Sequence, residues 1–162
     1  MNHLKLLLKR PLSKVSNGHA IALLVIALLG FADAAFLTVE HYRGVVPPCT
    51  TAGCDLVLTS QYSTLFGVPT SLLGALYYLA ILVAAFIFLE AKHIGGATES
   101  HHFSILKWAL IATVLGFLMS LWFIYLQVFI IHSYCLYCLG SALTSTVLFI
   151  VAMHALKKNE NV

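Results

Sequence analysis

The sequence predicts an all-α membrane protein, folded as a four-transmembrane-helix bundle. Of its 162 residues, 60% are hydrophobic and only 9% are charged, whereas charged residues make up about a quarter of a typical soluble domain. The hydrophobic residues also gather in four long blocks, each near the ~20 apolar residues that a helix needs to cross a ~30 Å hydrocarbon core. Composition and block length together indicate the lipid bilayer.

The four blocks cover residues 18–40, 68–89, 103–131 and 138–156. Because lipid offers the backbone no hydrogen-bond partner, a spanning segment has to be a helix or a strand of a closed barrel. The blocks lack the alternating pattern of barrel strands, so helices are predicted. A cleaved signal peptide is the alternative for the first block, since basic residues precede it and "ADA" at 32–34 resembles a cleavage site, but its apolar run is long for that role.

Basic residues predict which side of the membrane each connection faces. Eight of the nine lie before the first block, beside the second connection or after the fourth block: Lys5, Lys9, Arg10, Lys14, Lys92, Lys107, Lys157 and Lys158. Only Arg43 lies on the other side. Cytoplasmic connections carry the excess of Lys and Arg, so both termini are predicted to be cytoplasmic. The net charge of +3 comes mostly from these residues, and no nucleic-acid partner is expected.

This topology divides the chain into three parts. A basic N-terminal segment (1–17) and a short tail (157–162) are predicted to be cytoplasmic. The membrane domain (18–156) has an outer loop at 41–67 and a cytoplasmic loop at 90–102. All four cysteines then face the outer, non-cytoplasmic side, where disulfides form and persist.

Two of the cysteines, Cys135 and Cys138, stand in "CLYC" at the mouth of the fourth helix. We call them the helix pair. Their spacing places them on one helical face, and a helix N-terminus stabilises a thiolate and lowers its pKa. These features suit a redox centre. Inert buried thiols or a static disulfide are the alternative, and a zinc site formed with Cys49 and Cys54 is possible by count.

Cys49 and Cys54, the loop pair, are separated by "TTAG" in the outer loop. They can bond only if the segment turns back, because a disulfide needs Cα atoms about 4.4–6.8 Å apart. Closing so small a ring stabilises a fold by only about 2 kcal/mol, which favours exchange over a purely structural disulfide. A loop thiolate could attack a helix-pair disulfide through a mixed disulfide, although the spacing does not give the direction. The outer loop is therefore predicted to be redox-active.

These residues resemble the bacterial homologues of vitamin K epoxide reductase. The resemblance rests on four spans, on a loop pair ending in "GCDLVLTSQYSTLFGVPTSLLG", and on a "CLYC" that opens the last helix. It covers the chain from about residue 18 to 156. The DsbB group of quinone-linked thiol oxidases looks reversed, with its CxxC in the first outer loop.

The resemblance implies a role for each cysteine. Cys49 would take electrons from a reduced partner, Cys54 would exchange with Cys135, and Cys138 would face a quinone. Ser60, six residues after Cys54, matches a serine that the family keeps beside the active site.

The resemblance also implies a quinone pocket. Leu58 and Phe66 are expected to line it from the outer loop, and Tyr137 could cover the quinone ring. Two positions depart from the vertebrate enzymes: Thr70 falls about where they have an asparagine, and Ala142 stands where they have a tyrosine. Reduction of a respiratory quinone, ubiquinone or menaquinone, is therefore favoured over physiological epoxide reduction.

The predicted function is that of a quinone-dependent membrane thiol oxidoreductase that supports disulfide bond formation, without a metal. Many bacterial members carry a fused thioredoxin-like domain, whereas this sequence ends at "KKNENV". The expected partner is therefore a separate thioredoxin-fold, DsbA-like protein on the outer face of a bacterial cytoplasmic membrane. The alternative is a non-enzymatic four-span protein with two structural disulfides.

One intramembrane acid stands apart from the cysteines. Asp33 lies within the first span, where a carboxylate is costly and usually faces the bundle interior or water. It could donate a proton to a quinone, but a neutral, hydrogen-bonded interior acid is the preferred interpretation.

Overall fold

The computed structural model describes residues 17–49, 53–94 and 99–160. Four long helices dominate it: α2 (Asn17–Arg43), α4 (Thr70–Ile94), α5 (Glu99–Tyr125) and α6 (Leu136–Glu160). Each contributes all or most of an apolar stretch that is long enough to cross a membrane. These stretches are Gly18–Arg43, Thr70–Glu90, Ile111–Ile131 and Leu136–Ala155. The predicted all-α membrane fold with four spans is confirmed. Most of the basic N-terminal segment, part of the 90–102 loop and the last residues of the tail lie outside the described ranges.

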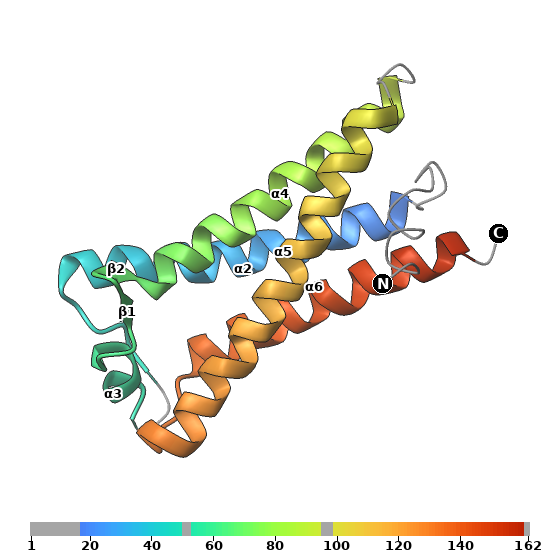
Figure 1. Ribbon diagram of the computed structural model, residues 1–162. Helices are drawn as coiled ribbons and strands as arrows, with labels where there is room; N and C mark the ends of the chain where they lie inside the picture. Colours follow the sequence, from blue (N-terminus) through green and yellow to red (C-terminus); the bar gives the residue numbers. More distant parts are fainter. Residues whose placement is uncertain (1–16, 50–52, 95–98, 161–162) are drawn as a thin grey trace.

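The bundle has two distinct ends (Figure 1). α2 packs against α4 and α6, while α5 packs against α6 and α4. The start of α2, the end of α4, the start of α5 and the end of α6 lie at one end. Helix α3 (Cys54–Thr59), the small hairpin and the junction between α5 and α6 lie at the other. Both cysteine pairs therefore occupy the same end, as the topology requires.

Small residues let the helices approach closely. The core cluster contains Ala27 and Ala34 of α2 and Ala75 of α4, packed with Tyr78 and Leu148. Gly30 lies beneath the ring of Tyr78, and a Cβ atom at Gly30 would overlap that ring. Close approach of this kind is how membrane helices associate when lipid removes the usual hydrophobic driving force.

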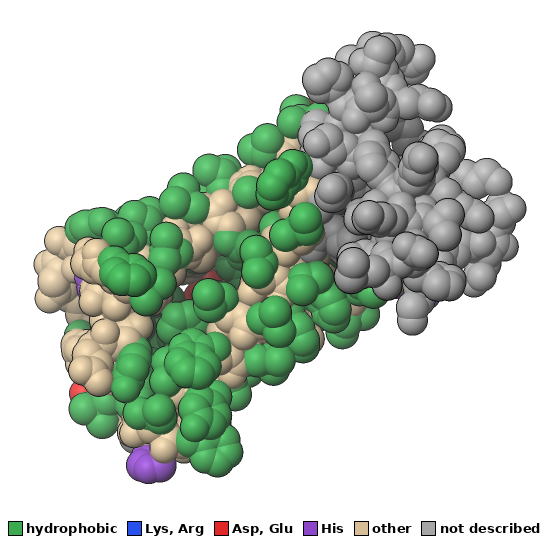
Figure 2. All heavy atoms as spheres, in the orientation of Figure 1, with side chains coloured by type: hydrophobic (Ala, Val, Ile, Leu, Met, Phe, Trp, Pro, Cys, Tyr) green, Lys and Arg blue, Asp and Glu red, His purple; other side chains and the backbone are tan. Residues whose placement is uncertain are grey.

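The face of the helices shown in Figure 2 is largely covered by hydrophobic side chains. Exposed side chains include Leu76, Val83 and Phe86 of α4 and Leu115, Leu118 and Trp122 of α5. A soluble protein rarely exposes so continuous an apolar surface. Lipid is the solvent that suits it.

Hydroxyl groups within the spans mostly bond inside their own helix. Thr38, Ser120 and Thr146 each donate to the carbonyl four residues earlier, at 2.7, 2.9 and 2.7 Å. Such bonds hide the hydroxyl from lipid at little cost. A polar side chain in the spans that makes no hydrogen bond is therefore unusual in this protein.

A two-stranded antiparallel hairpin follows α3. β1 (Thr64–Leu65) pairs with β2 (Val68–Pro69) through the register Leu65 to Val68. Phe66 and Gly67 form the two-residue turn, and both have positive φ angles, 51° and 80°. Left-handed backbone at both positions is the type I′ turn, whose twist matches that of the flanking strands. The ring of Phe66 consequently projects outward and is 98% exposed.

The end of the third span departs from α-helical geometry. After Tyr125 the chain continues as a π-helical segment, η1 (Leu126–Ile131), which ends at His132 with φ 54°. The Ser133 amide then donates to the Gln127 carbonyl at 3.1 Å. π-helical segments are rare and often found at functional sites, and this one leads directly into the helix pair.

Candidate active site: a relay of four sulfur atoms

The loop pair is joined in a disulfide. Cys49 and Cys54 are bonded, with their Cα atoms 6.0 Å apart, a separation within the range that a disulfide needs. Gly53 makes the entry into α3 with φ 90°, a backbone conformation that glycine adopts without strain. Two of the four thiols needed for the zinc alternative are thereby consumed. Within the ranges that the structure describes, no group of three His, Cys, Asp or Glu side chains is placed to hold a metal.

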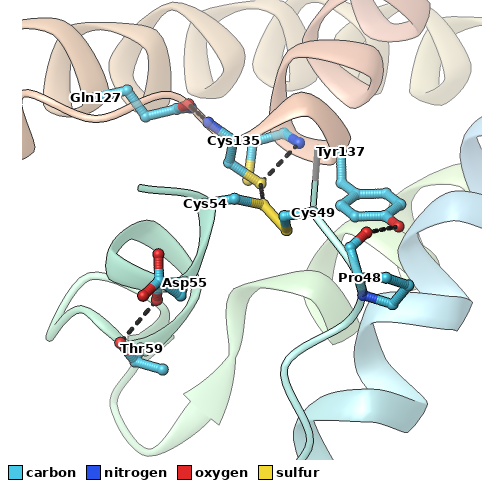
Figure 3. Close-up of a disulfide and its surroundings, with 9 residues drawn as sticks. Pro48, Cys49, Cys54, Asp55, Thr59, Gln127, Cys135 and Tyr137 are labelled. Carbon is cyan, nitrogen blue, oxygen red and sulfur yellow. Dashed lines mark hydrogen bonds between the residues drawn. A yellow bond between two sulfur atoms is a disulfide. The ribbon is translucent and has the colours of Figure 1, made fainter. Parts of the chain in front are cut away.

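The helix pair is reduced and lies against the disulfide (Figure 3). The Sγ of Cys135 is 3.6 Å from the Sγ of Cys54, which is sulfur-to-sulfur contact without a bond. Thiol–disulfide exchange begins with a thiolate beside one sulfur of a disulfide. The structure therefore brings together the two cysteines that the resemblance assigns to exchange.

Two contacts hold Cys135 in place. The side-chain oxygen of Gln127 accepts a hydrogen bond from the Cys135 amide at 2.9 Å, and Gln127 is itself buried. The Sγ of Cys135 accepts the amide hydrogen of Cys138 at 3.4 Å, as the capping group of an α-helix does. Cys135 thus sits at the N-terminus of α6 with its sulfur turned toward the loop.

These surroundings favour the thiolate of Cys135. A hydrogen bond from the Cys138 thiol is the largest cause that lowers the pKa of Cys135, and the amides of Cys138 and Tyr137 act in the same direction. Burial opposes them by disfavouring charge. The result is a Cys135 pKa of about 7, below its ordinary value of 9.0. A substantial fraction of Cys135 is then a nucleophile at neutral pH.

Burial differs along the four sulfur atoms. Cys54 and Cys135, the two inner members, are fully buried, and they form a small apolar cluster with Val57. Cys49 and Cys138, the two outer members, are only partly buried. The four sulfur atoms are therefore buried at the middle of the site and partly exposed at its two ends, Cys49 and Cys138.

Two further contacts fasten the loop to the start of α6. The Tyr137 hydroxyl donates to the Pro48 carbonyl at 3.0 Å. Gly53 lies directly against Ser133, because a Cβ atom at Gly53 would be 2.6 Å from the Ser133 hydroxyl oxygen. The chain needs glycine there for two reasons: its positive φ and its closeness to Ser133.

Cys138 opens into a central cavity of about 590 Å³ between the four long helices and the outer loop. Its volume lies within the range of about 300–1,000 Å³ that is usual for small-molecule sites. Most of the lining is apolar, including Leu37, Leu73 and Met119. A few polar groups also line it, and they are described below.

The structure places the predicted pocket residues in two groups. Leu58, Thr70 and Ala142 line the central cavity together with Cys138. Phe66 and Tyr137 are not among its lining residues. Phe66 projects from the hairpin turn, and Tyr137 is directed toward Pro48 and fastens the loop.

Ser60 closes the short helix that carries Cys54. Its hydroxyl donates to the Val57 carbonyl at 2.8 Å, and its amide bonds the same oxygen at 3.3 Å. The serine therefore fixes the end of α3 beneath the buried cysteine cluster.

Gln127 is absent from the sequence-based prediction, and so is the contact of Gly53 with Ser133. Gln127 is an isolated amide inside the apolar run "LWFIYLQVFII", and a lone polar side chain in a span signals a buried partner. Gly53 directly precedes Cys54 in "TTAGC". Its position beside a cysteine is a visible signal, but its contact with Ser133 depends on tertiary structure.

Four apolar helices of membrane length and a relay of cysteine sulfurs define an integral, multi-pass membrane protein with a thiol–disulfide site. The family model described as the vitamin K epoxide reductase family matches residues 21–153, which is most of the chain. The chain therefore belongs to that family and is a membrane thiol oxidoreductase. A comparison with curated protein sequences gave no match.

Proposed function

We propose that this protein re-oxidises a separate thioredoxin-fold, DsbA-like dithiol protein and passes the two electrons to a membrane quinone. The observation that carries the proposal is the accessibility along the relay. Cys49 is reachable from the loop side, Cys54 and Cys135 meet in a buried contact of 3.6 Å, and Cys138 opens into the central cavity. A dithiol and a lipid-soluble oxidant thus have separate entrances.

The first stage transfers electrons from the partner to the loop pair. A partner thiolate attacks the Sγ of Cys49, the disulfide to Cys54 breaks, and a mixed disulfide forms. The partner's second thiolate resolves this bond. The partner leaves oxidised, and Cys49 and Cys54 are both reduced.

The second stage is the internal exchange. The Cys54 thiolate attacks Cys135 of an oxidised helix pair, and Cys138 leaves as a thiolate. Cys49 then attacks Cys54, which re-forms the loop disulfide and releases Cys135 as a thiolate. The arrangement with a loop disulfide and two free helix thiols corresponds to the end of this stage. The amides at the start of α6 and the Cys138 thiol stabilise the departing Cys135 thiolate.

The third stage consumes the helix dithiol. Cys135 and Cys138 lose two electrons and two protons and form a disulfide, while a quinone gains both and becomes a hydroquinone. The central cavity suits such a substrate, because its walls are mainly apolar and Cys138 lies in them. Ubiquinone and menaquinone are both of the appropriate class.

The charge distribution supports a bacterial cytoplasmic membrane with the relay on its outer face. Eight of the nine basic residues belong to the N-terminal segment, to the adjoining parts of α4 and α5, or to the last part of α6. The start of α2, the end of α4, the start of α5 and the end of α6 lie at the end opposite the cysteines (Figure 1). The positive-inside rule assigns that end to the cytoplasm. The relay would then face the compartment in which disulfides are made.

Quinone reduction by a reduced DsbA-like protein, measured for each Cys→Ser variant, tests the proposal. Every single variant should lose turnover. A Cys138→Ser protein that reduced quinone at the wild-type rate would contradict the order of transfer. The alternative of two static disulfides predicts that no cysteine changes its redox state when the reduced partner is added.

A further inference from the structure

Three buried polar side-chain atoms have no hydrogen-bond partner among the described residues: Asp33 Oδ2, Tyr77 Oη and Ser145 Oγ. All three residues line the central cavity. Elsewhere in the spans, hydroxyls such as those of Thr38 and Thr146 are bonded within their helix. An unpaired polar group in a low-dielectric interior destabilises the fold. Three such groups on one cavity indicate that a polar group of a ligand forms hydrogen bonds with them.

The two adjacent tyrosines show the contrast most clearly. The Tyr78 hydroxyl is fully engaged, since it donates to the Ser141 carbonyl at 2.8 Å and lies 2.8 Å from the Thr144 hydroxyl. The Tyr77 hydroxyl is close enough to Ser145 for a weak electrostatic interaction, but neither hydroxyl makes a hydrogen bond of good geometry among the described residues. Its ring rests over Gly116, where a Cβ atom would overlap it. The packing of α4 on α5 therefore positions the Tyr77 hydroxyl but leaves it unpaired.

Asp33 differs from the two hydroxyl residues because it can carry a transferable proton. Its carboxyl lies ten residues before the end of α2, on the cavity wall. No salt-bridge partner for it lies within the described part of the chain, where the one ion pair joins Arg43 to Glu40. A negative charge on Asp33 would also raise the pKa of Cys135. Formation of the Cys135 thiolate and retention of a proton by Asp33 therefore favour one another.

We infer that Asp33, Tyr77 and Ser145 form the polar end of the quinone site, and that protonated Asp33 donates a proton to a quinone carbonyl oxygen. The inference rests on the proposed function. Tyr77 and Ser145 orient the carbonyl by hydrogen bonding. Asp33 is a catalytic residue, because it touches the oxygen that gains a proton.

The step balances without any other reactant. Two sulfur–hydrogen bonds of Cys135 and Cys138 break, and one sulfur–sulfur bond forms. The two electrons reduce the quinone, and two protons reach its oxygens. Asp33 gives one of these protons and regains it from the dithiol, so the carboxyl is protonated again after each turnover.

The test separates thiol exchange, quinone binding and quinone reduction in the full-length protein. Single-turnover oxidation of a reduced DsbA-like protein, without quinone, measures exchange. Calorimetric titration with a short-chain benzoquinone and its naphthoquinone counterpart measures binding in a Cys138→Ser background, where turnover is blocked. Steady-state reduction of the same quinones gives kcat and KM.

Asp33→Asn should keep single-turnover exchange and quinone binding near wild type but lower kcat about 100-fold, the usual contribution of a general acid. Asparagine keeps the size and polarity of the side chain and loses the proton. Tyr77→Phe and Ser145→Ala should instead weaken quinone binding about five- to tenfold, the effect of one lost hydrogen bond. Thr146→Val is the matched control for Ser145→Ala, because Thr146 bonds within α6 and does not line the cavity.

Several results would overturn the inference. Wild-type kcat in Asp33→Asn excludes proton donation, and an equal loss of single-turnover exchange assigns Asp33 a structural role. If quinone binding weakens as much in Thr146→Val as in Ser145→Ala, the proposed hydrogen bond from Ser145 to the quinone is contradicted. If the wild-type protein oxidises the partner yet neither binds nor reduces quinone, the proposed function itself fails, and that outcome is distinct because it appears without any substitution.

Discussion

The Sγ atoms of Cys54 and Cys135 lie 3.6 Å apart although 81 residues separate them in the chain. Both residues are fully buried. The contact therefore depends on the folded structure and not on random collision of exposed thiols. Two local features converge to make it. Gly53 turns the loop into α3, and the π-helical segment η1 carries Gln127 to the amide of Cys135.

Proximity of this kind predicts rapid and selective disulfide formation. A Cys49→Ser, Cys138→Ser protein keeps only Cys54 and Cys135 and should cross-link them within the chain on mild oxidation, because a small movement brings the sulfurs to bonding distance. Non-reducing electrophoresis after maleimide labelling measures the product. In the matched control, Cys54→Ser, Cys138→Ser, the remaining Cys49 and Cys135 should cross-link far more slowly. Equal rates would show that the observed contact does not govern exchange.

The pH dependence of the helix pair follows from the pKa of Cys135. In the reduced protein, Cys135 should lose its proton as the pH rises through about 7, rather than near 9.0. The ultraviolet absorbance of the thiolate, taken as the difference from a Cys135→Ser protein, reports this titration. Cys138→Ala removes the largest favourable interaction, so its midpoint should move upward, toward 9.0. A midpoint unchanged by Cys138→Ala would assign the effect to the backbone amides alone.

Gln127 should matter for both stability and reactivity. Gln127→Leu leaves the buried Cys135 amide without an acceptor, which should lower the free energy of unfolding by about 1–3 kcal/mol. Gln127→Glu keeps the acceptor but places a negative charge near Cys135, and should raise the pKa of Cys135. Thermal unfolding in detergent and thiolate titration measure the two effects. If Gln127→Leu is as stable as wild type, the hydrogen bond to Cys135 contributes little.

Gly53 offers a test of how the loop docks. Alanine at a positive φ costs about 1–2 kcal/mol, and at Gly53 it would also collide with Ser133. Gly44 is a matched control, because it has a similar φ of 67° and a Cβ atom added there would meet nothing within 4 Å. Gly44→Ala should lose only the backbone cost, whereas Gly53→Ala should lose more stability and should also slow exchange between Cys54 and Cys135. Adding Ser133→Gly should restore part of that rate.

The fold and the cysteine pairs could be predicted from the sequence, because both signals are local. Apolar blocks of membrane length give the spans, and their flanking basic residues predict the sidedness. The cysteine spacing indicates both pairs. The contact between Cys54 and Cys135 came only through resemblance, since no local rule relates positions 81 residues apart.

The cavity was harder to predict, because its lining comes from all four long helices. Leu58, Thr70 and Ala142 line it, but a quinone role for them stays a prediction. The preferred interpretation of Asp33 as a hydrogen-bonded acid was wrong for its Oδ2 atom, which has no partner in the described residues. Sequence can reveal a costly intramembrane acid, but only packing reveals whether a neighbour satisfies it.

The family resemblance suggests that Phe66 is a pocket residue, whereas its backbone indicates a turn residue. Its φ of 51° is unusual for a bulky side chain, whereas Asn–Gly is a favoured sequence for this two-residue turn. Phe66→Asn should therefore leave the KM for quinone unchanged and stabilise the hairpin slightly. Steady-state kinetics and thermal unfolding measure these effects, with Leu58→Ala as a positive control because Leu58 lines the cavity. A KM raised as much by Phe66→Asn as by Leu58→Ala would return Phe66 to the pocket.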